Sequence, residues 1–407
     1  GVPVMWAELS VGRTTRRNPV GAFKRLAPDS LWPGVGGLGV MTGVGILSFY
    51  SVVAGWTLSY VWHALIGDFG SAMTAEASGA LFGELTGSLL PVGLAAGVLL
   101  MTVLIVQAGI SAGIERASKI LMPILVGLLV ILAIRSATLP GGHEGLRYLF
   151  VPDFSKLSGA AILDALGQAM FSLSLGMGAM ITYGSYLSKS ENLPQAGATV
   201  ALFDTAIALL AGVMIFPALF AAGVAPGEGP GLVFVVMPTI FDALPAGGLF
   251  AIAFYVLLSI AALTSTIGLL EVVVSYFVDE QKWSRPKAAW IIGSGCALLA
   301  IPSAMSVGYS PLFGTFGEVF FGGMLGASFL DTQIAIWGTY SVAIGALLLC
   351  VFVGWKWGTR RALESLAESG DDVPLARAWS FLIRYVCPMA VGVVLLYKLY
   401  TTLFSAS

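Results

Sequence analysis

The sequence Gln168-Ala-Met-Phe-Ser-Leu-Ser-Leu-Gly-Met-Gly-Ala-Met-Ile-Thr-Tyr-Gly-Ser-Tyr186 decides the architecture of this chain. It is apolar enough to lie in a lipid bilayer, yet two serines and two glycines fall between Ser172 and Gly178. Serine hydroxyls compete for backbone hydrogen bonds and glycine adds conformational freedom, so this centre disfavours an unbroken helix. Hydrocarbon offers no partner for a freed N–H or C=O, and a broken helix is therefore tolerated only beside a polar cavity. The stretch predicts a discontinuous helix at a membrane-embedded binding site. The alternative is a continuous helix whose small residues allow close packing.

The composition of the whole chain points to the same environment. Of its 407 residues, 57% are hydrophobic and only 10% are charged, whereas soluble domains carry roughly 25% charged residues. The sequence therefore predicts an all-α polytopic membrane protein whose main partner is the lipid bilayer. A net charge of −2 argues against a nucleic-acid partner. The three cysteines lie in or beside apolar runs, so no disulfide framework is expected.

Apolar runs long enough to cross a bilayer, at about 20 residues each, recur along the chain. We expect about nine complete spans and, at residues 1–10, the end of another, all within one transmembrane domain covering residues 1–407. The chain begins with Gly1 rather than Met, and we expect its start to be missing. The complete runs lie at 34–66, 88–110, 118–136, 160–187, 197–222, 247–278, 287–303, 329–355 and 378–403.

The basic residues alternate between the two sides of the predicted spans. Most of the 20 Lys and Arg residues fall in alternate connections, and the connections 67–87, 223–246 and 304–328 contain none. The positive-inside rule places the basic connections in the cytoplasm, which puts the C-terminus outside an inner-membrane, multi-pass protein. Within the outer connection 223–246, the apolar segment 230–241 is predicted to be a helical lid; the alternative is a loop packed on the bundle.

Asp204 stands inside the apolar run 197–222. A charge there costs several kcal/mol unless it is paired, so an intramembrane acid is a functional-site candidate by default. The alternative is a protonated or hydrogen-bonded structural carboxyl.

A second candidate is formed by the carbonyl of Ala261 and the hydroxyls of Thr264 and Ser265. These three residues share one helix face because residues three and four apart are neighbours. Oxygen atoms on one face suit a small hard cation; the alternative is that the hydroxyls bond to carbonyls of their own helix.

Other candidates give weaker signals. Tyr50 lies inside the first complete span, where tyrosine is more often a packing residue than a ligand. Gly113 and Pro123 loosen the start of the run 118–136, either unwinding its cytoplasmic end or kinking it. His63 and His143 lie at span ends without a cluster of metal ligands. No nucleotide loop or catalytic triad is present, so we do not expect an enzyme.

Four segments, in order and at the right spacing, resemble the neurotransmitter:sodium symporters, in particular bacterial hydrophobic amino-acid transporters. Gly1-Val-Pro-Val-Met-Trp-Ala-Glu-Leu-Ser-Val-Gly-Arg13 looks like the family's second helix, and 168–186 looks like the sixth. Ala261-Ala-Leu-Thr-Ser-Thr266 and Asp279-Glu-Gln-Lys-Trp-Ser-Arg285 look like the eighth helix and its exit. The resemblance runs over nearly the whole chain and implies a LeuT-type inverted-repeat helical bundle.

The resemblance implies a substrate site formed around the broken helix. Tyr50 matches the tyrosine whose hydroxyl meets the substrate carboxylate, and Phe171 matches the aromatic residue that closes over the substrate. The unwound region and the pocket wall are matched by the remaining substrate-site residues, which are Ile46, Ser174, Met177, Gly178, Ser265 and Leu269.

The resemblance also implies two sodium sites. Ser172 matches a hydroxyl ligand of the first site, and Asp204 matches a position where many members carry an asparagine ligand. Ala261, Thr264 and Ser265 match ligands of the second site. Position 208 is Ala where family members can carry an acid, which leaves chloride dependence open.

Three further positions are implied to act in gating. Gly113 and Pro123 match a glycine-x9-proline pattern associated with inward opening, and Asp331 is the candidate for the outer gate acid. One departure is large: the family's first helix and half of the second have no counterpart here. At about 20 residues per span, roughly 40 residues are missing, and we expect a sequence truncated at its start.

The function implied is a sodium-coupled secondary transporter, a symporter that imports an amino acid with a hydrophobic side chain by alternating access. One alternative is a proton-coupled carrier with Asp204 as the proton site. Another is a non-transporting sensor or the truncated remnant of such a transporter. The amino acid, the ion stoichiometry and the oligomeric state stay open at this point.

Overall fold

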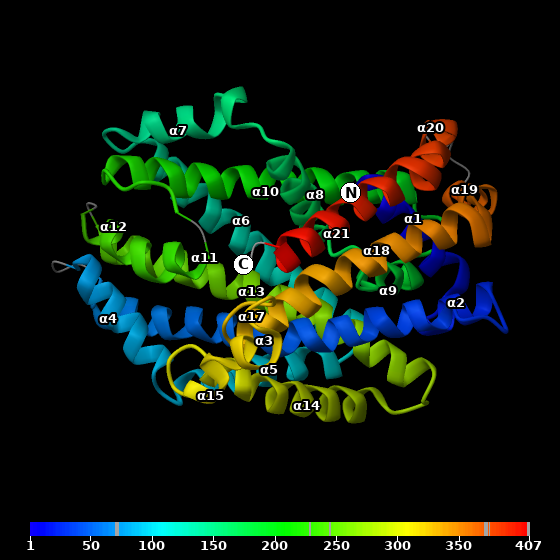
Figure 1. Ribbon diagram of the computed structural model, residues 1–407, viewed down its shortest axis with the longest axis horizontal. Helices are drawn as coiled ribbons and strands as arrows, with labels where there is room; N and C mark the ends of the chain where they lie inside the picture. The colour runs from blue at the N-terminus through cyan, green and yellow to red at the C-terminus, as the bar shows by residue number, and fades with distance from the viewer. Residues whose placement is uncertain (70–72, 228, 244–245, 370–372, 374, 405–407) are drawn as a thin grey trace.

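The computed structural model describes residues 1–69, 73–227, 229–243, 246–369, 373 and 375–404, and every regular element within these ranges is a helix. Eight helices in this part of the chain are long and apolar enough to cross a membrane. Several of them run along the long axis of the molecule (Figure 1). They are α3 (Pro33–Ile66), α5 (Leu90–Gln107), η1 (Ile110–Glu115) continued by α6 (Arg116–Ala137), α10 (Leu193–Ala221), α13 (Gly247–Asp279), α14 (Arg285–Met305), and two composite runs over 329–366 and 376–404.

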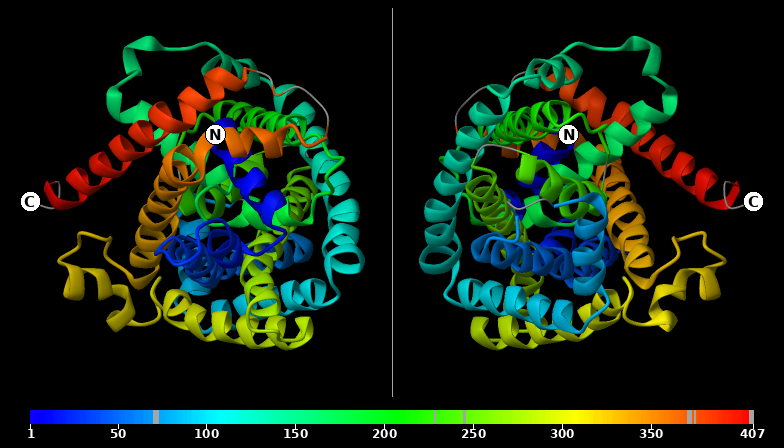
Figure 2. Two further views of the ribbon diagram at one scale, coloured as in Figure 1. Left: turned by 90° about the vertical axis from the view of Figure 1, so that its right-hand side faces the viewer. Right: turned by 90° about the vertical axis from the view of Figure 1, so that its left-hand side faces the viewer.

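The two composite runs contain π-helical turns. The first passes through α17 (Phe329–Gln333), η4 (Ile334–Ser341), α18 (Val342–Val351), η5 (Phe352–Gly358) and α19 (Thr359–Leu366). The second comprises α20 (Ala376–Phe381), η6 (Leu382–Val386) and α21 (Cys387–Phe404). Viewed from either end, α21 extends away from the body of the molecule to the C-terminus (Figure 2).

The shorter elements connect or cap these spans. Near the N-terminus, α1 (Val2–Thr15) packs against α9 (Ala179–Tyr186), and α2 (Pro19–Leu26) packs against α3. The others are α4 (Ala75–Thr86), α7 (Gly142–Phe150), η2 (Phe154–Lys156), α8 (Gly159–Ser172), α11 (Gly229–Gly231), η3 (Leu232–Val236), α12 (Met237–Ala243), α15 (Pro311–Gly314) and α16 (Phe316–Phe321).

The break predicted in the deciding stretch is confirmed. Helix α8 ends at Ser172, α9 starts at Ala179, and the residues between them are non-helical. Ser174, Gly176 and Gly178 have φ values of 54°, 81° and 78°, in the left-handed region that favours glycine. The run 160–187 is thus two short helices in line, which is why it is not among the eight long ones.

The backbone of the break has protein partners, as a membrane interior requires. The N–H of Gly176 donates to Oε1 of Glu8 at 2.7 Å, and Glu8 is fully buried in α1. On the other side the backbones of Gly176 and Gly345 touch: a Cβ on Gly345 would lie 2.0 Å from the carbonyl oxygen of Gly176. The non-helical turn is therefore wedged between α1 and α18.

The segment 229–243 is helical, as the sequence predicted for a lid. Two tyrosines of the bundle hold it in place: the Tyr60 hydroxyl donates to the Phe234 carbonyl at 2.7 Å, and the Tyr255 hydroxyl donates to the Val233 carbonyl at 2.9 Å. The rings of Tyr60, Tyr255 and Phe234 also pack together in the core. This aromatic cluster joins the segment to α3 and α13.

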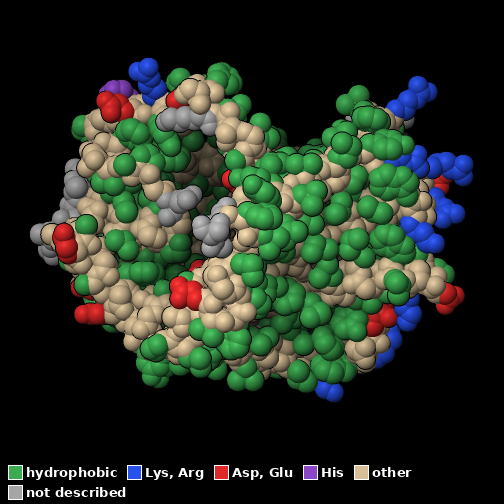
Figure 3. Space-filling view, in the orientation of Figure 1, with side chains coloured by type: hydrophobic (Ala, Val, Ile, Leu, Met, Phe, Trp, Pro, Cys, Tyr) green, Lys and Arg blue, Asp and Glu red, His purple; other side chains and the backbone are tan. Residues whose placement is uncertain are grey.

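Charge is distributed unevenly along the long axis. Most of the Lys and Arg side chains visible in Figure 3 gather at the end formed by α2, α19 and α20. There the buried Arg13 lies 3.7 Å from a carboxylate oxygen of Glu368, which also binds Lys189 at 2.7 Å. One basic end is what the alternating pattern of the sequence predicts for a bundle of antiparallel spans.

Candidate functional site

A cavity of about 340 Å³ lies beside the break, between α3, the α8–α9 pair and α13. Residues from these three elements, far apart in the sequence, line this one cavity at the point where α8 ends. Most of the predicted site residues line it: Ile46, Tyr50, Phe171, Ser172, Ser174, Met177, Thr264, Ser265 and Leu269.

The cavity has an electrostatic polarity set by the two half-helices. The C-terminal end of α8 and the N-terminal end of α9 meet at its wall. Helix C-termini carry partial negative charge and N-termini carry partial positive charge. A zwitterion placed at the break would therefore find carbonyls for an ammonium group and amides for a carboxylate.

Ser172 and Asp204 are brought together by the tertiary structure. The Ser172 hydroxyl donates to Oδ1 of Asp204 at 2.6 Å, which links the end of α8 to α10. Asp204 is half-buried and does not itself line the cavity. The hydrogen bond fits both readings of Asp204, since a structural carboxyl and a cation ligand would each accept it.

On α13, the predicted face is present and two of its three members line the cavity. Thr264 donates to the Ala261 carbonyl at 2.8 Å, and Ser265 donates to the same carbonyl at 3.2 Å. The alternative interpretation, in which the hydroxyls bond to carbonyls of their own helix, predicted these two hydrogen bonds. They do not exclude a cation, because a hydroxyl that donates one bond keeps lone pairs for a second partner. Tyr50 of α3 and Ser265 of α13 line the same cavity.

The remaining predicted residues lie outside the cavity. Gly178 lies on the opposite side of the break, where a Cβ would meet Pro19 at 2.6 Å. Gly113 is in the π-helical turn η1, directly followed by α6, and Pro123 stands inside α6 without ending it. The start of this span is therefore helical rather than unwound.

Asp331 has a local role that the sequence did not suggest. It sits in the first turn of α17, where its carboxylate accepts hydrogen bonds from the backbone N–H and the hydroxyl of Ser328, at 3.1 and 2.8 Å. The Ser328 hydroxyl in turn accepts from the Asp331 N–H at 3.1 Å. This reciprocal pair is a capping box, which stabilises the start of a helix.

Several residues of the site were missed by sequence reasoning. Gln168, Ala179, Tyr183 and Gly268 also line the cavity. Glu8 supports the break from the side of α1, where its carboxylate accepts a hydrogen bond from the Gly176 N–H. The signal that singled out Asp204, an acid within an apolar helix, also applies to Glu8.

Glu271 carries the same signal and was also missed. It is fully buried in α13, accepts a hydrogen bond from the Tyr186 hydroxyl, and is paired with Arg285. Arg285 also donates to the Val106 carbonyl at 2.9 Å. This network joins α9 to α13, α14 and α5, because the Tyr186 hydroxyl of α9 binds the carboxylate of the Glu271–Arg285 ion pair.

Residues 86–405 match the sequence model of the sodium:neurotransmitter symporter family. The chain belongs to this family. It is 38% identical over 405 residues to an uncharacterized sodium-dependent transporter, YhdH, of Bacillus subtilis, with 97% of this chain and 86% of the relative covered. It is 31% identical over 418 residues to an uncharacterized sodium-dependent transporter of Methanocaldococcus jannaschii, with 97% and 79% covered. A sodium- and chloride-dependent GABA transporter of Drosophila melanogaster is 25% identical over 452 residues, with 98% and 45% covered.

A solved structure, that of MhsT in complex with L-phenylalanine, is similar over 98% of this chain and 88% of the MhsT chain. The TM-score is 0.87 and the sequence identity is 43%. This symporter-family chain therefore has the LeuT-type all-helical fold and is a multi-pass membrane protein. The family consists of sodium-dependent transporters rather than enzymes.

Proposed function

We propose that this protein is a sodium-coupled symporter that imports an amino acid with a hydrophobic side chain. The observation that carries the proposal is the cavity beside the break, whose lining combines hydroxyl groups with apolar side chains. Tyr50, Ser172 and Ser265 supply hydroxyl groups. Ile46, Phe171, Met177 and Leu269 supply apolar walls, and the flexible Met177 can adapt to side chains of different size. That MhsT has been solved with L-phenylalanine supports this choice of substrate class.

In this proposal the α-carboxylate of the substrate lies near Tyr50 and the first sodium ion, and the ammonium group lies at the end of α8. Ser172 and Asp204 hold the first sodium, and the side chains and carbonyl of Ala261, Thr264 and Ser265 hold the second. All are oxygen donors, as a hard cation requires. Asp204 contributes a formal negative charge that an asparagine at this position would lack.

Transport then requires that the site open alternately to each side of the inner membrane. We propose that η1, which contains Gly113, together with Pro123 in α6, is the element that changes conformation when the inner sodium leaves. A π-helical turn is a frequent feature of functional sites in helices and can rewind to α-helix with small shifts. Asp331 stays a candidate for the outer gate. The single domain and the outside C-terminus are part of the same proposal.

The test is sodium-dependent uptake by the protein in proteoliposomes. A binding screen across the amino acids, in sodium and in choline, identifies the substrate first. Uptake of that amino acid is then measured with an inward sodium gradient and with choline, each at two pH values. We expect uptake in sodium only. Uptake in choline that follows an inward proton gradient would favour the proton-coupled carrier, and binding without uptake would favour a sensor.

Thr264→Val is expected to raise the sodium concentration for half-maximal uptake by about tenfold. The change keeps the shape of the side chain and removes one oxygen ligand, and a polar contact to a charged group contributes about 1.5–3 kcal/mol. The matched control is Thr138→Val, because Thr138, which directly follows α6, donates to the Arg135 carbonyl at 2.9 Å with the same spacing and does not line the cavity. An unchanged sodium response in Thr264→Val would remove this residue from the second site.

Gly268→Ala is expected to weaken binding of aromatic amino acids about tenfold while sparing small ones, as one methylene in an apolar pocket can do. A Cβ here would lie 2.9 Å from the Tyr183 hydroxyl oxygen, and both residues line the cavity, so Tyr183 must shift. Gly295→Ala on α14 is the control, since its Cβ would meet nothing within 4 Å. If the substitution left the affinity for phenylalanine and the affinity for alanine both unchanged, the pocket for the substrate side chain would lie elsewhere.

A further inference from the structure

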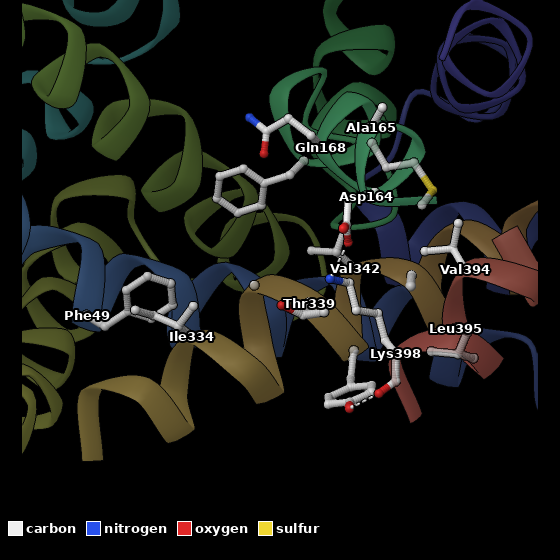
Figure 4. Close-up of a pocket in the computed structure, with 16 residues that line it drawn as sticks. Phe49, Asp164, Ala165, Gln168, Ile334, Thr339, Val342, Val394, Leu395 and Lys398 are labelled. Atoms are coloured by element: carbon white, nitrogen blue, oxygen red, sulfur yellow. Dashed lines mark hydrogen bonds and ion pairs between the residues drawn. The ribbon is translucent and has the colours of Figure 1, made fainter. Parts of the chain in front are cut away.

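A second, larger cavity of about 600 Å³ adjoins the candidate site (Figure 4). It lies between α8, the η4–α18 run and α21, and Gln168 and Phe171 line both cavities. Asp164 of α8 and Lys398 of α21 are the charged residues among its described lining. In Figure 4 the Lys398 side chain reaches toward Asp164, and its Nζ binds Oδ1 of Asp164 at 2.6 Å.

The backbone of Lys398 accepts a hydrogen bond, in addition to the ion pair made by its side chain. The Tyr340 hydroxyl, from η4, donates to the Lys398 carbonyl at 3.2 Å and lies 2.5 Å from the Thr402 hydroxyl, one turn further along α21. The helix α21 is thus attached to η4 at the position from which Lys398 extends. The ion pair consequently connects α8 to the η4–α18 run through α21.

The sequence of α8 places this connection on the face that builds the candidate site. Asp164, Gln168, Phe171 and Ser172 are separated by four, three and one residues, a spacing that keeps all four on one helix face. At 1.5 Å per residue, Ser172 lies about 12 Å along the axis from Asp164. Because α8 ends at the break, its rotation and tilt are not set by α9. A contact at Asp164 is therefore able to set the direction in which Phe171 and Ser172 point.

We propose that the Asp164–Lys398 ion pair is a positioning element that orients α8 so that Phe171 and Ser172 complete the candidate site. Neither charged group touches that site, and both act through α8. This proposal rests on the proposed function, since it assumes that the cavity at the break binds the substrate. The side chains of Lys398 and Asp164 are 36% and 53% exposed, so the attraction between them is open to screening by salt.

The test uses the full chain in detergent and measures sodium-dependent binding of L-phenylalanine, or of the tightest amino acid in the screen. Lys398→Gln and Asp164→Asn are each expected to raise the dissociation constant about threefold to fivefold, the upper range for partly exposed ion pairs. The double exchange Asp164→Lys with Lys398→Asp is expected to restore it to within about twofold. Thermal unfolding of each variant checks that the chain folds.

Two comparisons separate positioning from a general structural role. Raising choline chloride at fixed sodium is expected to weaken binding by the natural protein and to leave binding by the double variant Lys398→Gln with Asp164→Asn unchanged. The control variant is Arg360→Gln, which breaks an exposed pair with Glu364 within α19, at 3.3 Å, and is expected to bind normally. Variants that bind like the natural protein, or an exchanged pair as weak as the single variants, would overturn the positioning role alone. A natural protein that binds no amino acid in sodium would overturn the proposed function and the positioning role together.

Discussion

Replacing Asp204 with alanine is expected to abolish sodium coupling, with at least about a 100-fold rise in the sodium concentration needed for half-maximal substrate binding. Removing partners that only orient a metal ligand costs 10- to 100-fold in affinity, and a charged ligand contributes more than its supports. The side chain is half-buried and accepts a hydrogen bond from the Ser172 hydroxyl at 2.6 Å, and that neutral hydroxyl cannot replace its negative charge. The measurement is amino-acid binding as a function of sodium concentration.

The conservative variant Asp204→Asn decides between sodium and proton coupling. An amide oxygen can still coordinate sodium, so a weakened but measurable sodium response is expected. An amide cannot take up a proton at physiological pH, and a proton-coupled carrier would lose transport as completely as with alanine. The sodium assignment would be falsified if Asp204→Ala retained full sodium-driven uptake.

The second large effect is expected at Gly176. Gly176→Ala should destabilise the folded protein by about 2–4 kcal/mol, combining strain at positive φ with overpacking. Its φ is 81°, and a Cβ would lie 2.1 Å from the Val342 carbonyl oxygen and 2.7 Å from the Ala346 nitrogen. These are backbone atoms of α18, which can move only if the whole helix shifts. The measurement is the thermal unfolding midpoint in detergent, together with the yield of monodisperse protein.

Gly37→Ala provides the matched control for that substitution. Gly37 lies within α3, has no left-handed φ, and a Cβ there would meet nothing within 4 Å. The control is expected to keep or slightly raise the unfolding midpoint, since alanine is preferred over glycine inside helices by about 1 kcal/mol. Equal midpoints for Gly176→Ala and Gly37→Ala would mean that the break tolerates a side chain, and that its glycine has another role.

The largest effects thus fall on two residues that the sequence marked for different reasons. Asp204 was conspicuous because an acid in an apolar run demands an explanation, and Gly176 because glycines and serines crowd the centre of a span. The same reasoning, applied to Glu8 and Glu271, would have identified the acid that supports the break and the acid that forms the buried ion pair. Gln168, Tyr183 and Gly268 carried no such signal, because polar, aromatic and small residues occur on many helix faces.

By itself, the sequence determined the membrane environment, the approximate limits of the spans, and the position of the break. These follow from local properties: apolar length, charge content, and the conformational preferences of serine and glycine. The family resemblance implied that Ser172 and Asp204 share one site, and Tyr50 and Ser265 another. The tertiary structure decided the hydrogen bond between Ser172 and Asp204, the cavity that Thr264 and Ser265 share with Tyr50, and the capping role of Asp331. It also decided the contact between Asp164 and Lys398, which are 234 residues apart. Helix periodicity tells which residues share a face, but the partner of that face depends on how the helices pack.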